Sequence, residues 1–121
     1  MKNSNNELRK YVESIAAELK AMYEANFTDE ELEVLEENGE PADLYEYFAE
    51  NALDVEYTIS GNGDFLGARV AVTLGGPNVW IDTREGCVKG YWGSGKEEAW
   101  IPTEICDGIN FIFEESYNCL K

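Results

Sequence analysis

Histidine is absent from this sequence. It is the commonest general base in enzymes, a frequent activator of serine and cysteine nucleophiles, and the commonest metal ligand. The glycines at residues 61–63 and 75–76 also lack the Lys-Ser/Thr helix start that a phosphate-binding loop needs. We therefore predict that the protein is not an enzyme, and that it has no catalytic residue, no metal site and no cofactor.

Cysteine is scarce, and long apolar runs are missing. The three cysteines, Cys87, Cys106 and Cys119, form neither a CxxC pair nor an even set, which indicates free thiols in a reducing compartment. No apolar run approaches the roughly 18 residues of a membrane span. The first residues lead into an amphipathic helix instead of an apolar signal core. The cytoplasm is therefore the expected compartment.

Basic residues are few. Nine Lys and Arg stand against 25 Asp and Glu, which gives a formal net charge of −16. The hydrophobic fraction of 44% is close to the globular norm, so the chain should fold in spite of its charge. Such a protein repels nucleic acid and anionic membranes and is steered toward basic surfaces. Alternatively, the acidity serves solubility alone or reflects a salt-adapted host.

The first part of the chain has the hydrophobic periodicity of helices. Apolar residues recur at helical spacing within residues 5–26. Thr28 and Glu31 fit a capping box at the start of a second helix, and Gly39 is a suitable stop for it. Pro41 is expected to open a third helix, because proline is favoured in a first turn.

The period changes to two in the second part. We expect strands at residues 55–59, 66–74, 79–81 and 88–92, a brief edge segment at 99–101, and a last helix from Pro102-Thr103 onward. This order predicts an α+β fold with N-terminal helices, an antiparallel meander of four or five strands, and a C-terminal helix packed on one face of the sheet. No repeat or linker interrupts the pattern, so residues 1–121 are predicted to form one domain.

The acidic residues are concentrated in one tract. From Glu24 to Asp54 there are twelve acidic residues and no Lys or Arg, whereas the rest of the chain has thirteen acidic residues with all nine basic ones. Glutamates four residues apart repel each other on a helix, and the first-turn dipole explains only a few of them. The candidate partner-binding residues are Asp29, Glu30, Glu33, Glu36, Glu37, Glu40, Asp43, Glu46 and Glu50.

Carboxylates on successive helical turns can approach the charge density of a nucleic-acid backbone. The tract is therefore interpreted as a surface that binds a basic protein, specifically the groove of a nucleic-acid-binding protein. No direct binding to nucleic acid or to a membrane is expected, and the oligomeric state stays open. The competing interpretation is a solvated acidic surface that has no partner.

Aromatic residues cluster in the predicted sheet. The candidate contact residues are Trp80, Tyr91 and Trp92, with Trp100 nearby. Alternate aromatics on adjacent strands can form a stacking platform, and outward-facing ones can form a protein interface. Nucleic-acid binding there is disfavoured because few basic residues lie close by. The favoured alternative is that most of these rings pack beneath the helices.

Residues 75–83, 88–93 and 105–109 resemble small acidic proteins carried by phages and conjugative elements of gut Firmicutes. The resemblance implies no activity and no site residue, only a setting in which mobile elements encode acidic inhibitors of restriction or CRISPR nucleases. We therefore expect a non-enzymatic acidic inhibitor or decoy. The alternatives are an immunity or antitoxin-like protein that caps a basic toxin, and an accessory or enzyme domain that uses the sheet aromatics.

Overall fold

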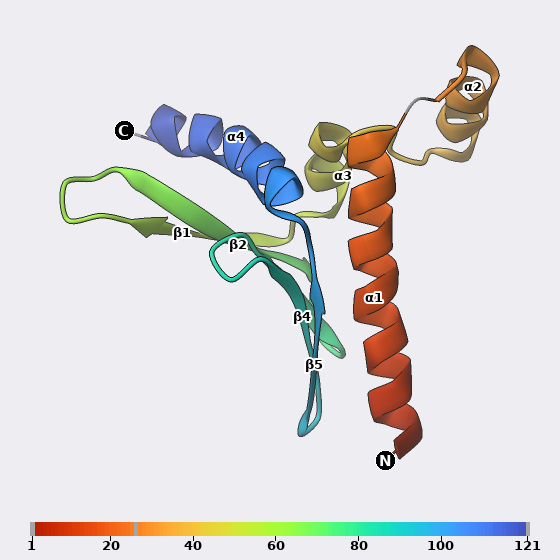
Figure 1. Cartoon of the computed structure of the whole chain (residues 1–121), viewed down its shortest axis with the longest axis horizontal. Coiled ribbons are helices and arrows are strands. Elements are labelled where there is room, and N and C mark those ends of the chain that lie inside the picture. The colour runs from red at the N-terminus through yellow and green to blue at the C-terminus, as the bar shows by residue number, and fades with distance from the viewer. Residues whose placement is uncertain (1, 26, 121) are drawn as a thin grey trace.

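The computed structural model describes residues 2–25 and 27–120, with side chains from residue 6 onward. Its elements follow one another along the chain as helices, strands and a last helix (Figure 1). They are α1 (Lys2–Glu24), α2 (Asp29–Asn38), α3 (Leu44–Asn51), β1 (Asp54–Ile59), β2 (Phe65–Thr73), β3 (Asn78–Asp82), β4 (Cys87–Trp92), β5 (Gly95–Trp100) and α4 (Thr103–Leu120). The predicted α+β class is confirmed.

The sheet is an open antiparallel meander in the order β1-β2-β3-β4-β5. Each strand pairs with the next one along the chain, as expected for strands joined by short turns. The predicted edge segment at residues 99–101 is a full strand that already begins at Gly95. Lys96, Glu97 and Glu98 of this strand are charged, so they gave no alternating hydrophobic signal in the sequence. Charged residues of this kind are common on edge strands.

Helix α1 packs against β4 and β5, and α4 packs against β2. Both helices supply side chains to one cluster of buried residues, together with α3 and the inner face of the sheet. From α1 these are Val12, Ile15 and Leu19, and Leu8 of the same stripe is also buried. The C-terminal helix therefore contacts the sheet on the same side as α1, as predicted.

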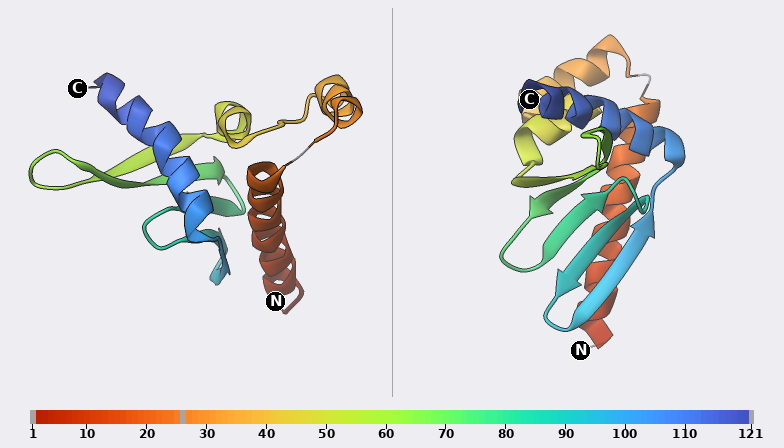
Figure 2. Two further views of the ribbon diagram at one scale, coloured as in Figure 1. Left: turned by 45° about the horizontal axis from the view of Figure 1, so that its top comes forward. Right: turned by 90° about the vertical axis from the view of Figure 1, so that its left-hand side faces the viewer.

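The close approach of α1 to the sheet depends on Gly90. A Cβ atom at this position would lie 2.6 Å from Val12 Cγ1 and 2.9 Å from Leu8 Cδ1. Figure 2, on the right, shows α1 running behind the strands. Because side chains alternate along a strand, the neighbours of Gly90 in β4, Lys89 and Tyr91, point to the other face. No helix of the described residues covers that face.

The helix boundaries differ in detail from the predicted ones. Helix α1 begins at Lys2 and ends at Glu24, whereas residues 5–26 were expected; residue 26 lies outside the described part of the chain. Helix α3 begins at Leu44 instead of Pro41, because Asp43 in extended conformation is its N-cap. Across the described residues, no helix combines the length and apolar character needed to cross a membrane.

Candidate partner-binding site

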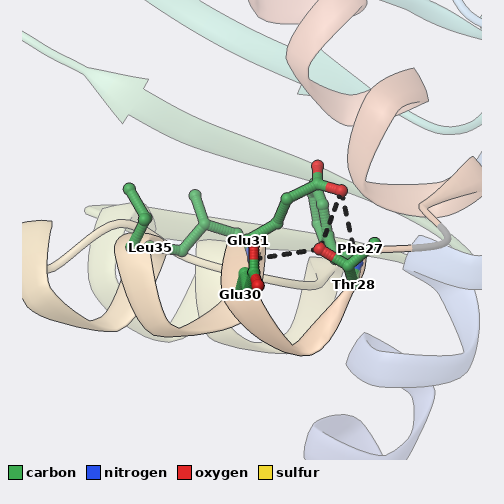
Figure 3. A pocket seen from close by; sticks show the side chains of 6 residues that line it. Phe27, Thr28, Glu30, Glu31 and Leu35 are labelled. Carbon is green, nitrogen blue, oxygen red and sulfur yellow. Dashed lines mark hydrogen bonds between the residues drawn. The ribbon is translucent and has the colours of Figure 1, made fainter.

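Helix α2 is stabilised at both ends by hydrogen bonds between residues close together in the sequence. The Thr28 hydroxyl accepts a hydrogen bond from the Glu31 amide (3.1 Å), and the Glu31 carboxylate accepts one from the Thr28 amide (3.3 Å). Figure 3 shows the Glu31 side chain reaching back to Thr28. At the other end Gly39 has a φ of 69°, and its amide donates to the Glu36 carbonyl. The capping box and the glycine stop are confirmed.

Helix α2 projects away from the rest of the molecule (Figure 1). It has no buried residue. Leu32 and Val34 are 40% and 54% exposed, respectively. Phe27, Val34 and Leu35 line a shallow hollow of about 520 Å³ on this helix (Figure 3). The helix therefore presents both its carboxylates and part of its apolar surface to solvent.

Five carboxylates of α2 lie along one side of the helix, and we call them the acidic stripe. Asp29, Glu33 and Glu37 follow one another at intervals of four residues, and Glu30 and Glu36 flank this row at helical spacing. All five are exposed, and none forms an ion pair with a described residue. The stripe is therefore an unneutralised row of negative charge.

Two of the nine predicted residues serve as caps of α3. The Asp43 carboxylate accepts a hydrogen bond from the Glu46 amide (2.8 Å), and the Glu46 carboxylate accepts one from the Ala42 amide (3.0 Å). Both side chains remain exposed. Local capping therefore explains why acidic residues occur at these two positions. It does not explain the other seven.

A groove lies between α2 and α3. It has a volume of about 430 Å³ and is lined by four carboxylates, from Glu36, Glu40, Glu46 and Glu50, and by the apolar side chains Leu32 and Leu35. We call it the acidic groove. Glu36 belongs to both the acidic stripe and the acidic groove, so the two are continuous. The structure thus brings eight of the nine predicted residues together, and Asp43 caps the helix beside them.

A second cavity involves residues that the sequence did not single out. Tyr11 and Glu18 of α1 line it together with Tyr47 of α3. Burial, and then the charge of Glu40, raises the pKa of Glu18. Burial, and then the charge of Glu18, raises the pKa of Tyr47. Glu40 and Glu50, which also line this cavity, belong to the predicted set. For Tyr11 and Glu18 the only sequence signal was their spacing of seven residues on one side of α1.

The sheet aromatics do not form the cluster that was predicted. None of Trp80, Tyr91, Trp92 and Trp100 is among the buried residues, so the interpretation that most of them pack beneath the helices is wrong. Trp80 faces the helix-free side, where the Arg69 guanidinium lies 4.5 Å from the centre of its ring. Trp92 alternates with Tyr91 along β4 and so points to the opposite side. The three rings therefore form no single platform.

Two of the three cysteines lie in the interior of the protein. Cys87 and Cys106 are buried, and Cys119 is exposed. Burial, reinforced by Glu98 and Asp82, raises the pKa of Cys87 to about 11. A thiol with such a pKa stays protonated near neutral pH and is a poor nucleophile. Among the described residues, no group of three or more His, Cys, Asp and Glu side chains could hold a metal ion.

Comparison with known proteins does not add to this description. No family model, no curated protein and no solved structure matches the chain.

Proposed function

We propose that this chain is a non-enzymatic binding protein that uses the acidic stripe and the acidic groove to engage a basic protein. The main support for this proposal is the position and exposure of α2. This helix projects from the molecule, buries no side chain and carries its unpaired carboxylates on one side.

The electrostatics of the segment are unfavourable for the free protein. Asp29, Glu33 and Glu37 repel one another at four-residue spacing, which costs a few tenths of a kcal/mol per pair. No Lys or Arg occurs between Glu24 and Asp54 to offset this repulsion. A basic partner would remove it, and it would approach rapidly because opposite fields steer association.

The partner class that fits is a protein built to bind nucleic acid. Such a protein presents rows of Lys and Arg in a groove that accepts a line of phosphates, and the acidic stripe offers a comparable line of charge along one helix. The groove adds Leu32 and Leu35 beside its four carboxylates. A nuclease of host defence belongs to this partner class, and the resemblance to proteins of mobile elements favours such a nuclease.

The test is a pull-down with the purified protein from host lysate, at low salt and at roughly 0.5 M salt, where screening is strong. We expect a basic nucleic-acid-binding protein at low salt and much less of it at high salt. Replacing Glu33, Glu36, Glu37 and Glu40 by Lys should abolish its recovery. The matched control replaces four exposed glutamates of α1 and α4, Glu7, Glu13, Glu114 and Glu115, by Lys and so changes the net charge equally.

Three outcomes would contradict the proposal. One is the absence of any basic protein at low salt. Another is unchanged recovery with the variant of residues 33–40, which would make the segment a solvated surface only. The third is equal loss with both variants, which would mean that the total charge acts and the site does not. Circular dichroism would verify that both variants remain folded.

A further inference from the structure

A cavity of about 280 Å³ opens where α1, the α2–α3 turn and α3 meet the end of β2. Three carboxylates line it, and each comes from a different element: Glu18 from α1, Glu40 from the turn and Glu50 from α3. None of these carboxylates forms a hydrogen bond or an ion pair with a described residue, and no Lys or Arg lines the cavity. We call this site the Tyr47 cavity.

The burial of Tyr47, after which the cavity is named, is the second observation in favour of a ligand site. Tyr47 is only 5% exposed, and its ring packs edge to face against Phe48. Its hydroxyl makes no hydrogen bond with any described residue, although it lies close enough to Glu18 and Tyr11 for both to act on it electrostatically. A polar side chain so deeply buried normally has a hydrogen-bond partner. The Tyr47 hydroxyl is not among the fully enclosed polar atoms, and Tyr47 lines the cavity, so its hydroxyl remains accessible to a ligand there.

The lining indicates which kind of ligand suits the cavity. The three carboxylates can only accept hydrogen bonds, and the hydroxyls of the two tyrosines can accept as well as donate, so a cation with several N–H donors suits this lining. Ile15 and Val72 supply an apolar wall that suits an aliphatic stem. The volume lies below the range of pockets for drug-sized ligands and suits a single side chain.

We propose that the Tyr47 cavity is the anchor site for an arginine side chain of the basic partner, an inference that rests on the proposed function. Arginine fits better than lysine because its planar guanidinium has five donors in a fixed arrangement and stacks on aromatic rings such as Tyr11. The cavity shares Glu40 and Glu50 with the acidic groove. One arginine can therefore enter it while neighbouring basic residues lie along the groove.

The experiment is an NMR titration of the whole chain with N-acetyl-argininamide. The control ligand is N-acetyl-citrullinamide, which has nearly the same shape and no charge, at matched ionic strength. We expect saturable shifts at Tyr47, Glu50 and Glu40 with the arginine compound and none with citrulline. N-acetyl-lysinamide should bind more weakly. Citrulline shifts equal to those of arginine, or tighter binding of the lysine compound, would overturn the assignment to arginine.

Two pairs of variants locate the site. Tyr47→Phe keeps the ring and removes the hydroxyl, and its control Tyr45→Phe changes a ring that is 66% exposed on the same helix. Glu50→Gln removes one charge at an exposed position and should leave the fold intact; its control is Glu115→Gln. We expect Glu50→Gln to weaken arginine binding about tenfold and Tyr47→Phe about threefold. Unchanged dissociation constants for both variants would overturn the proposal.

This titration can be distinguished from the pull-down. If N-acetyl-argininamide binds at Tyr47 but no basic protein is recovered from lysate, the guanidinium site stands and the proposed function fails. If a basic partner is recovered but the arginine compound does not bind at Tyr47, the proposed function stands and the anchor site is rejected. Reduced recovery of the partner with Glu50→Gln, but not with Glu115→Gln, would show that the basic partner uses the Tyr47 cavity.

Discussion

Helices α1 and α2 are both amphipathic, yet the molecule uses them in opposite ways. In α1, four apolar residues at helical spacing (Leu8, Val12, Ile15 and Leu19) are almost completely buried. In α2, Leu32 and Val34 remain exposed and no residue is buried. The first helix is stabilised by the core, whereas the second is stabilised by its caps. An apolar stripe therefore does not by itself show that a helix belongs to the core.

The same contrast holds for charge. Every ion pair among the described residues lies in α1, in the sheet or in its turns, such as Arg9 with Glu97 (2.9 Å) and Arg69 with Glu56 (2.6 Å). The segment of α2 and α3 contains none. Unpaired carboxylates are tolerated there because they remain in water, where repulsion is screened. A surface kept in this state is available to a basic partner.

The largest expected effect on the free energy of unfolding is the difference between a Leu→Ala truncation in α1 and one in α2. Leu19→Ala in α1 should lower the free energy of unfolding by about 2–5 kcal/mol, because it opens a cavity in the core. Leu32→Ala in α2 should change it by less than about 0.5 kcal/mol, as for ordinary surface substitutions. Urea unfolding of both variants measures this difference. Equal losses would mean that α2 is part of the core.

The second prediction concerns the close packing of α1 on the sheet, which α2 lacks. Gly90→Ala should cost about 1–3 kcal/mol, because the new Cβ atom would overlap Val12 and Leu8. The control is Gly61→Ala in the turn after β1, where nothing lies within 4 Å of the added atom. Thermal unfolding would compare the two variants. A Gly90→Ala variant as stable as the wild type would show that α1 can move away without cost.

The third prediction separates local from global stability. Thr28→Ala removes the side-chain cap of α2 and should weaken that helix by about 1 kcal/mol. Amide hydrogen exchange within α2 should therefore become faster, while exchange in α1 and the sheet stays the same. Ser116→Ala, at an exposed site of α4, is the control. Faster exchange throughout the molecule would contradict the separation of α2 from the core.

The smallest expected effect concerns pH. The pKa of Glu18 is raised by burial and by Glu40, so the folded state binds its proton more tightly than the unfolded state does. The stability of the wild type should then fall as pH rises from about 4.5 through the higher folded pKa. Glu18→Gln should remove this decline and be more stable at pH 7. The gain should be less than about 1 kcal/mol, because Glu18 is only partly desolvated and remains largely exposed to solvent.

Urea unfolding between pH 4.5 and pH 7 tests this prediction, with Glu13→Gln of the same helix as the control. A wild type whose stability rises over that interval relative to Glu18→Gln would contradict the sign of the effect. Saturation with N-acetyl-argininamide should reverse the decline, because a bound cation favours the charged carboxylate.

Most of the fold could be predicted from local patterns. The meander followed from alternating residues in four of the five strands, and β5 was largely missed because Glu97 and Glu98 replace the apolar residues of such a pattern. In the candidate site, the caps at Thr28 and Gly39 were predicted correctly. The start of α3 was placed too early, because the favoured position of Pro41 was given more weight than the capping side chain of Asp43.

The sequence by itself determined the acidic segment, its helices and the acidic stripe, because these features depend on residues three or four positions apart. Only the tertiary structure decided that α2 projects from the core, that the Arg69 guanidinium lies over the Trp80 ring, and that Glu18 meets Glu40, Glu50 and Tyr47. The last three of these residues lie within one acidic segment, but Glu18 is on another helix. Their meeting depends on how α1 and α3 pack, which no local pattern encodes.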